Sequence, residues 1–216
     1  MEKVKYLFIF IITFLIGILG ITGFIFTQKS PAKPITNIIQ TVAKPDFSIA
    51  NSPSESIRGS VKQMSGDVFW QSRVATNSSQ INSLIFLQQG EEIQTKDNGN
   101  LVLEFPNIIN MTVSPKTQID FVQTLPQEFV ISIASGSADI KKLSDTPVSI
   151  RSYHLLIRQN TGDLSLNVDI EKGITSLNVI SGSVTASYND LDLTSHVIDF
   201  TGGQKANFND ATRSFE

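Results

Sequence analysis

The chain has 216 residues, with 17 Lys and Arg against 20 Asp and Glu, a formal net charge of -3 at pH 7, and no cysteine. Without cysteine there are no disulfides, thiolate nucleophiles or lipoprotein-type anchors, so an exported domain would depend on its apolar core alone. The slightly acidic balance includes no basic stripe that could neutralise phosphates, which argues against nucleic acid as a partner.

The first predicted element is a membrane-spanning helix over residues 6–26, after a short tail of residues 1–5. These 21 residues carry no charge, and 15 of them are Leu, Ile or Phe. At about 1.5 Å per residue such a helix reaches roughly 32 Å, which matches the hydrocarbon core of a bilayer. We therefore expect residues 6–26 to contact membrane lipid.

The basic residues Lys3 and Lys5 before this segment predict a cytoplasmic amino terminus and a body outside the membrane, although Lys29 and Lys33 on the other side partly oppose that orientation. The apolar run exceeds the roughly 7 to 15 residues of a cleaved signal, so we expect a retained signal-anchor. Cleavage near Ser30-Pro31-Ala32 is the alternative.

Residues 27–57 are predicted to be a flexible linker. They contain Pro31, Pro34, Pro45 and Pro53 among Ser, Thr, Asn and Lys, a composition with too little apolar surface to fold. As a coil, this length spans about 30 Å on average, so the linker would hold the following domain clear of the lipid headgroups.

From residue 58 onward the hydrophobic period is two. The clearest case is residues 164–170, LSLNVDI, where apolar and polar side chains alternate, and no window keeps the spacing of an amphipathic helix. Short strands separated by Gly, Asn, Asp and Pro favour two packed sheets. We expect residues 58–216 to form one all-β domain, a two-layer β-sandwich or flattened β-roll, with a small barrel as the alternative.

Glycines predict where this domain bends. Gly66, Gly136 and Gly182 each follow a serine between strand-like residues, which suggests a bulge or tight bend. In residues 87–95, LQQGEEIQT, Leu87 and Ile93 are expected to point inward around a turn at Gly90, with Glu91 and Glu92 solvated.

The order of seven short pieces gives a resemblance to a known family. The pieces are residues 59–61, 87–95, 99–105, 113–119, 135–138, 175–184 and 203–206. In this order they resemble the FecR-like domain family, whose L-x-x-G-D-x-I-x-T signature is similar to residues 87–95 with Glu91 in place of Asp. Residues 150–155, IRSYHL, stand where the family has a Gly-Thr element that this chain lacks.

The resemblance implies a role in the bacterial cell envelope. The best-known members couple an outside signal to a cytoplasmic helical segment that controls a sigma factor. Only residues 1–5 precede the predicted span, so the resemblance here implies an extracytoplasmic β domain that senses, binds or scaffolds.

Few side chains form a pattern typical of catalysis or metal binding. His154 and His196 have no partner at metal-ligand spacing and are expected to be polar members of strands. Asn189, Asp190 and Asp192 hold oxygens that Ca²⁺ accepts, but their spacing is typical of an ordinary turn.

Three neighbouring pairs have simple structural interpretations. Glu91 and Glu92 should point apart, without the cleft that a glycosidase pair needs. Phe69 and Trp70 should face opposite sides of a strand and pack, with an exposed binding platform as the alternative. Lys141-Lys142 is expected on a solvated sheet edge, where lysine discourages pairing with another sheet.

We therefore expect a membrane-anchored, non-catalytic sensing, binding or scaffolding module with a protein partner in the envelope. No catalytic, cofactor-binding or metal residue is predicted, and no cofactor. A structural surface or assembly protein and an envelope-modifying enzyme are the alternatives, and the sequence leaves the oligomeric state open.

Overall fold

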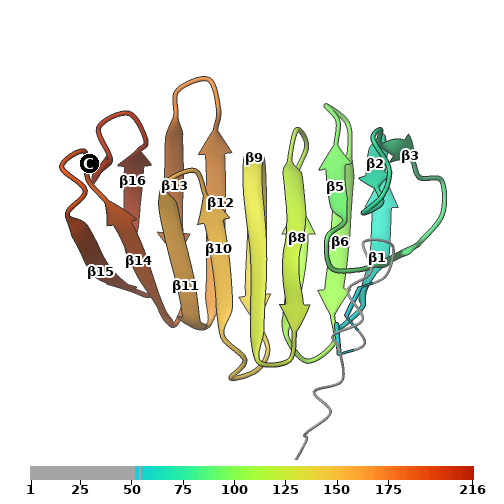
Figure 1. Ribbon diagram of the computed structural model, residues 1–216, viewed down its shortest axis with the longest axis horizontal. Helices are drawn as coiled ribbons and strands as arrows, with labels where there is room; N and C mark the ends of the chain where they lie inside the picture. The colour runs from blue at the N-terminus through green and yellow to red at the C-terminus, as the bar shows by residue number, and fades with distance from the viewer. Residues whose placement is uncertain (1–51, 54) are drawn as a thin grey trace, which may run out of the picture. The chain divides into compact units, whose positions relative to one another are not determined.

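The computed structural model describes residues 52, 53 and 55–216 (Figure 1). The predictions for residues 1–5 and 6–26, and most of the predicted linker 27–57, lie outside these residues. The chain divides into the units Met1–Asp46 and Phe47–Glu216, and all described residues belong to the second. Among the described residues, none forms a helix that is both long and apolar enough to cross a bilayer.

The all-β prediction is confirmed, because the described residues form seventeen strands and no helix. Their hydrogen bonds divide them into two layers. In spatial order, sheet A contains β4 (Phe86–Leu87), β1 (Gly59–Ser65), β6 (Asn100–Phe105), β7 (Ile109–Val113), part of β9 (Glu128–Lys142), β12 (Asp163–Asp169), β13 (Ile174–Val179), β16 (Lys205–Asn209) and β17 (Ser214–Phe215).

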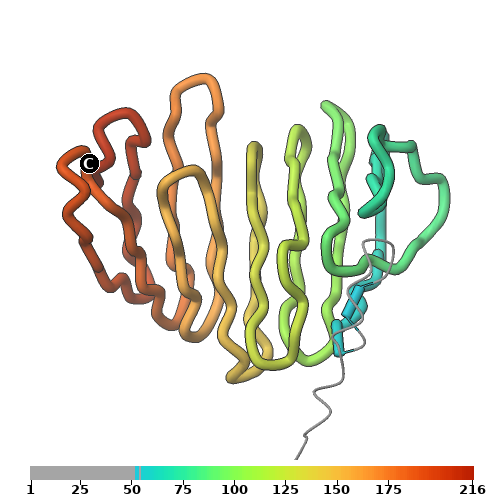
Figure 2. Tube along the Cα trace, viewed as in Figure 1, coloured from blue at the N-terminus to red at the C-terminus, as the bar shows by residue number. Residues whose placement is uncertain are grey.

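Sheet B has the same number of members. In spatial order it contains β3 (Ser79–Gln80), β2 (Val68–Gln71), β5 (Glu92–Thr95), β8 (Gln118–Leu125), the other part of β9, β10 (Val148–Ser152), β11 (Leu155–Thr161), β14 (Ser183–Asn189) and β15 (Ser195–Thr201). Figure 2 shows the chain advancing hairpin by hairpin between the two layers. Both layers end in edge strands, so the described strands do not close into the alternative small barrel.

Strand β9 belongs to both layers. Its first half pairs with β8 and, in parallel, with β10, while its second half pairs with β7 and β12 from Gly136 onward. Gly136 has φ +83°, and a Cβ there would collide with Thr117 and the carbonyl of Lys116. Gly66 and Gly182 also have positive φ, so the bends predicted at all three Ser-Gly pairs are confirmed.

The core lies between the layers and is built by strict alternation. In β12, Leu164, Leu166 and Val168 are buried, while Ser165 and Asn167 face outward. The same alternation in β6, β7, β11 and β13 produces one continuous apolar cluster. Two outer faces therefore remain for function, one on each sheet.

Candidate functional site

A shallow trough of about 280 Å³ with charged groups in its lining lies on the outer face of sheet A. Strands β7, β9 and β12 form its floor. Its polar side chains are Asn110, Thr112, Asp139, Lys141 and Asp163. We call this feature the trough.

Strand register places the charges of the trough. Lys141 lies opposite Asn110 on one side and opposite Asp163 on the other, and Thr112 lies opposite Asp139 in the next row. Directly opposed residues of antiparallel strands have Cβ atoms about 5 Å apart, so these groups are neighbours. Val102 and Ile180 add apolar surface to the lining.

The trough suits recognition of a polar, charged segment. It offers one ammonium, two carboxylates, an amide and a hydroxyl on a rigid sheet, and its lining includes no His or Cys. Lys141 forms no ion pair with any side chain in the described part of the chain.

The predicted edge location of Lys141 and Lys142 is wrong. Both lie in β9, which is paired on each side in sheet A. Lys142 turns back to the protein, where its Nζ donates to the carbonyl oxygen of Asn160 at 2.6 Å, and burial lowers its pKa. Local sequence gave no sign that a Lys-Lys pair ends an interior strand.

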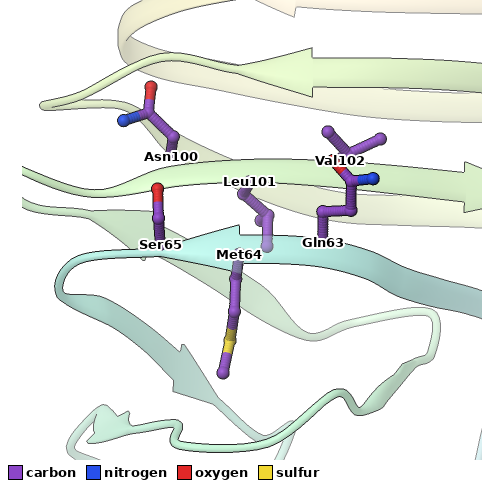
Figure 3. Close-up of a pocket in the computed structure, with 6 residues that line it drawn as sticks. All are labelled: Gln63, Met64, Ser65, Asn100, Leu101 and Val102. Atoms are coloured by element: carbon purple, nitrogen blue, oxygen red, sulfur yellow. The ribbon is translucent and has the colours of Figure 1, made fainter.

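A second hollow, between β1 and β6, has a volume of about 150 Å³ and carries no titratable side chain. Figure 3 shows Met64 pointing away from Ser65 and Gln63, which lie on the same side of the strand pair as Asn100. Its lining is Gln63, Met64, Ser65, Asn100, Leu101 and Val102. Only amide and hydroxyl groups are offered, so this hollow provides far less chemistry than the trough.

The turn at Gly90 agrees with its prediction in all but one respect. Leu87 and Ile93 are fully buried and Gly90 has φ +81°, as predicted. Glu91, however, is only 7% exposed, so its predicted solvation is wrong. Its Oε2 accepts hydrogen bonds from Trp70 Nε1 at 3.1 Å and from the backbone N–H of Gln88 at 2.8 Å.

These hydrogen bonds also settle the role of Trp70. Trp70 lies opposite buried Ile93 and packs against the core, whereas Phe69 lies on the other face with Lys96 Nζ 5.2 Å from its ring centre. The prediction that the two rings face opposite sides is confirmed. Trp70 is therefore part of the packing and not an exposed platform.

Glu92 takes part in a carboxyl pair that the sequence did not predict. It lies opposite Asp120 across β5 and β8. Burial raises the pKa of both side chains, and the negative charge of Asp120 raises the pKa of Glu92 further. The two residues are remote in sequence, so only the strand register brings these like charges together.

Each histidine is held by an aspartate. His154 lies in the turn between β10 and β11, which corrects its predicted place in a strand, and its Nδ1 is 2.8 Å from Asp210 Oδ1. Its Nε2 is 3.2 Å from Arg213 Nη2. His196 lies on β15 as predicted, with Nε2 2.8 Å from Asp190 Oδ2.

The turn interpretation of residues 189–192 is supported by its hydrogen bonds. Asp190 Oδ1 accepts from the backbone N–H groups of Asp192 and Thr194 at 3.0 and 2.9 Å. The hydrogen bond with His196 lowers the pKa of Asp190. Residues 52, 53 and 55–216 contain no group of three or more His, Cys, Asp or Glu arranged to hold a metal ion.

Comparison with known proteins gives a likeness of fold. No protein-family model matches the chain, and no curated protein matches it. Two crystal structures of a proposed anti-sigma factor from Parabacteroides distasonis, at 2.50 and 1.65 Å, match it with a TM-score of 0.51 and 12% identity. The match covers 58% of this chain and 57% of the matched chain. The shared fold therefore extends over little more than half the length of either protein.

Proposed function

We propose that this chain is a single-pass membrane protein whose residues 58–216 form a FecR-like domain outside the cytoplasm that binds or senses without catalysing a reaction. Three observations support the proposal: the apolar residues 6–26, the order of the FecR-like motifs, and the fold shared with a proposed anti-sigma factor. The trough is the binding surface in this proposal, and its ligand is a polar segment of another envelope protein.

The charges of the trough define that partner. Lys141 meets a carboxylate of the partner, while Asp139 and Asp163 meet a Lys or Arg side chain nearby. Because these groups are spread over neighbouring strands of a rigid sheet, an extended segment that lies across β7, β9 and β12 contacts all of them at once. Such a contact needs positioning of charge and no reactive side chain.

Photocrosslinking in intact cells tests this role. A photoreactive residue replaces Thr112 in the trough of the full chain, and the matched control carries it at Thr161 on sheet B, which is also exposed. We expect a discrete protein adduct from position 112, absent from position 161 and lost when Lys141→Glu is added. Equal labelling from both positions, or labelling insensitive to Lys141→Glu, would show that the trough is not the binding surface.

The location has a separate test. A reporter enzyme that is active only outside the cytoplasm is fused after Glu216, and a second reporter that is active only in the cytoplasm serves as the control. We expect activity from the first fusion, recovered with the membrane fraction. Activity from the cytoplasmic reporter alone would overturn the orientation.

A further inference from the structure

The four sheet edges of the described strands are not alike. Sheet A ends in β4 and β17, and sheet B begins with β3, and each of these three strands has two residues. The fourth edge is β15, which has seven residues and pairs only with β14 (Figure 1). One long row of backbone donors and acceptors is therefore open at this edge.

Strand β15 also lacks the features that protect exposed edges. Its sequence, SHVIDFT, contains no Lys, Pro or Gly. The single charged residue, Asp199, points along the outer face and accepts a hydrogen bond from Thr185 Oγ1 at 2.7 Å. Val197 is 67% exposed on the same face. Nothing in this edge opposes the addition of another strand.

We propose that β15 pairs in antiparallel fashion with β15 of a second copy of this chain, with the two-fold axis at Val197. The two copies of sheet B then form one continuous sheet across the axis. The proposal uses a surface remote in strand order from the trough, so it does not depend on the proposed ligand.

Side-chain pairing selects this register. With the axis at Val197, each exposed Val197 faces its own copy, and Asp199 faces Ser195 of the other chain. An axis at Asp199 places two carboxylates opposite each other, which is unfavourable. An axis at Ile198 places Val197 opposite Asp199 and leaves the exposed valine against a charge.

The neighbouring turns support a second copy as the occupant. Leu191 and Leu193, in the turn between β14 and β15, are 65% and 73% exposed. An axis at Val197 places the start of one β15 beside the end of the other, so the turn that carries Leu191 and Leu193 lies near the turn at residues 202–203 of the second copy. Gly203 has open space where a Cβ would lie, so its turn leaves room for the exposed leucines of the other copy. This complementarity is contained within one sequence.

The absence of cysteine makes the register directly measurable in the full chain. Val197→Cys places two thiols face to face, and directly opposed residues lie about 4.5 to 5.5 Å apart between Cα atoms, within disulfide range. The matched control is Leu156→Cys, an exposed residue in the same row of sheet B on β11. Both are oxidised mildly in native membranes.

We expect the Val197→Cys dimer to form at least about tenfold faster than the Leu156→Cys dimer, because pairing gives the thiols a high effective concentration. Val197→Lys on the full chain in detergent should shift the dimer to monomer in light scattering while circular dichroism stays unchanged. Equal oxidation rates at the two positions would overturn the proposal. In cells that produce the Val197→Cys variant, a disulfide bond between this thiol and a different protein would also overturn the proposal, because β15 would then bind another partner.

Discussion

The two ends of the β unit are finished in different ways. At the end formed by β1 and β2, the chain covers its own edges, because residues 72–87 return to add β3 beside β2 and β4 beside β1. The backbone N–H of Val61 also donates to the carbonyl of Ile85 at 3.0 Å. At the end formed by β14 to β17, aromatic side chains close the space between the layers instead.

The aromatic closure leaves backbone groups open. Phe208 and Phe215 have ring centres 5.3 Å apart, and Tyr188 packs on both and stacks on His196 at 5.0 Å. These rings protect the core from water, but they add no hydrogen bond to β15. Closing an apolar core and pairing an edge are thus separate requirements, and this protein meets both at only one end.

The largest effect should come from an aromatic cluster on β6, β8 and β9, in the half of the β unit that begins at the first end. Phe105 is fully buried, with its ring centre 5.1 Å from that of Phe121 and 4.7 Å from that of Phe129. Phe105→Ala should lower the free energy of unfolding by about 3 to 5 kcal/mol, because it leaves a cavity that a sheet cannot collapse around. Urea denaturation followed by the fluorescence of Trp70 measures the change.

The control at the other end is Phe215→Ala. Phe215 is only partly buried, so its loss should cost about 1 to 2 kcal/mol. Equal losses for the two variants would mean that the aromatic cluster holds the second end as firmly as the buried core holds the first.

The next effect concerns the buried carboxylate at the first end. Glu91→Ala removes the acceptor of Trp70 Nε1 and of the Gln88 N–H, and should cost about 1.5 to 3 kcal/mol, the range for hydrogen bonds to a charged group. A red shift of Trp70 emission should accompany the loss. Glu91→Gln keeps an acceptor oxygen, so it should cost less. If both variants cost the same, the charge and not the hydrogen bond holds this turn.

Features that depend on residues close together in the sequence could be predicted, whereas features that depend on residues far apart in the chain could not. Alternation in residues 164–170 and glycines at bends are local signals, and they correctly predicted β12 and the positive φ of Gly136. The trough was not predicted, because Asn110, Lys141 and Asp163 come from three strands whose register is set by the whole sheet.

The errors have the same origin. A Lys-Lys pair is common on an edge, and only the pairing of β9 on both sides shows that Lys141 is interior. Glu91 was expected in solvent because it follows a turn glycine, yet Trp70 from another strand covers it. The pairing of His154 with Asp210 joins two turns that only the sheet order brings together.

The smallest effect concerns the carboxyl pair Glu92 and Asp120 in sheet B and its response to pH. The pKa values of Glu92 and Asp120 are raised in the folded state. The protonated pair therefore contributes stability that is fully present below the pKa values of the unfolded state and is lost as the pH rises through those of the folded state. At pH 7 two like charges oppose each other across β5 and β8.

Glu92→Gln should therefore stabilise the β unit at pH 7 by roughly 0.2 to 1 kcal/mol, the range for opposed charges, and should change little near pH 3, where both carboxyls are protonated. Urea midpoints measured from pH 3 to pH 8 follow the difference. Glu128→Gln, an exposed change on β9, is the control and should show no such growth with pH. A Glu92→Gln gain that is the same at every pH would trace the effect to packing, and the carboxyl pair would then carry no electrostatic penalty.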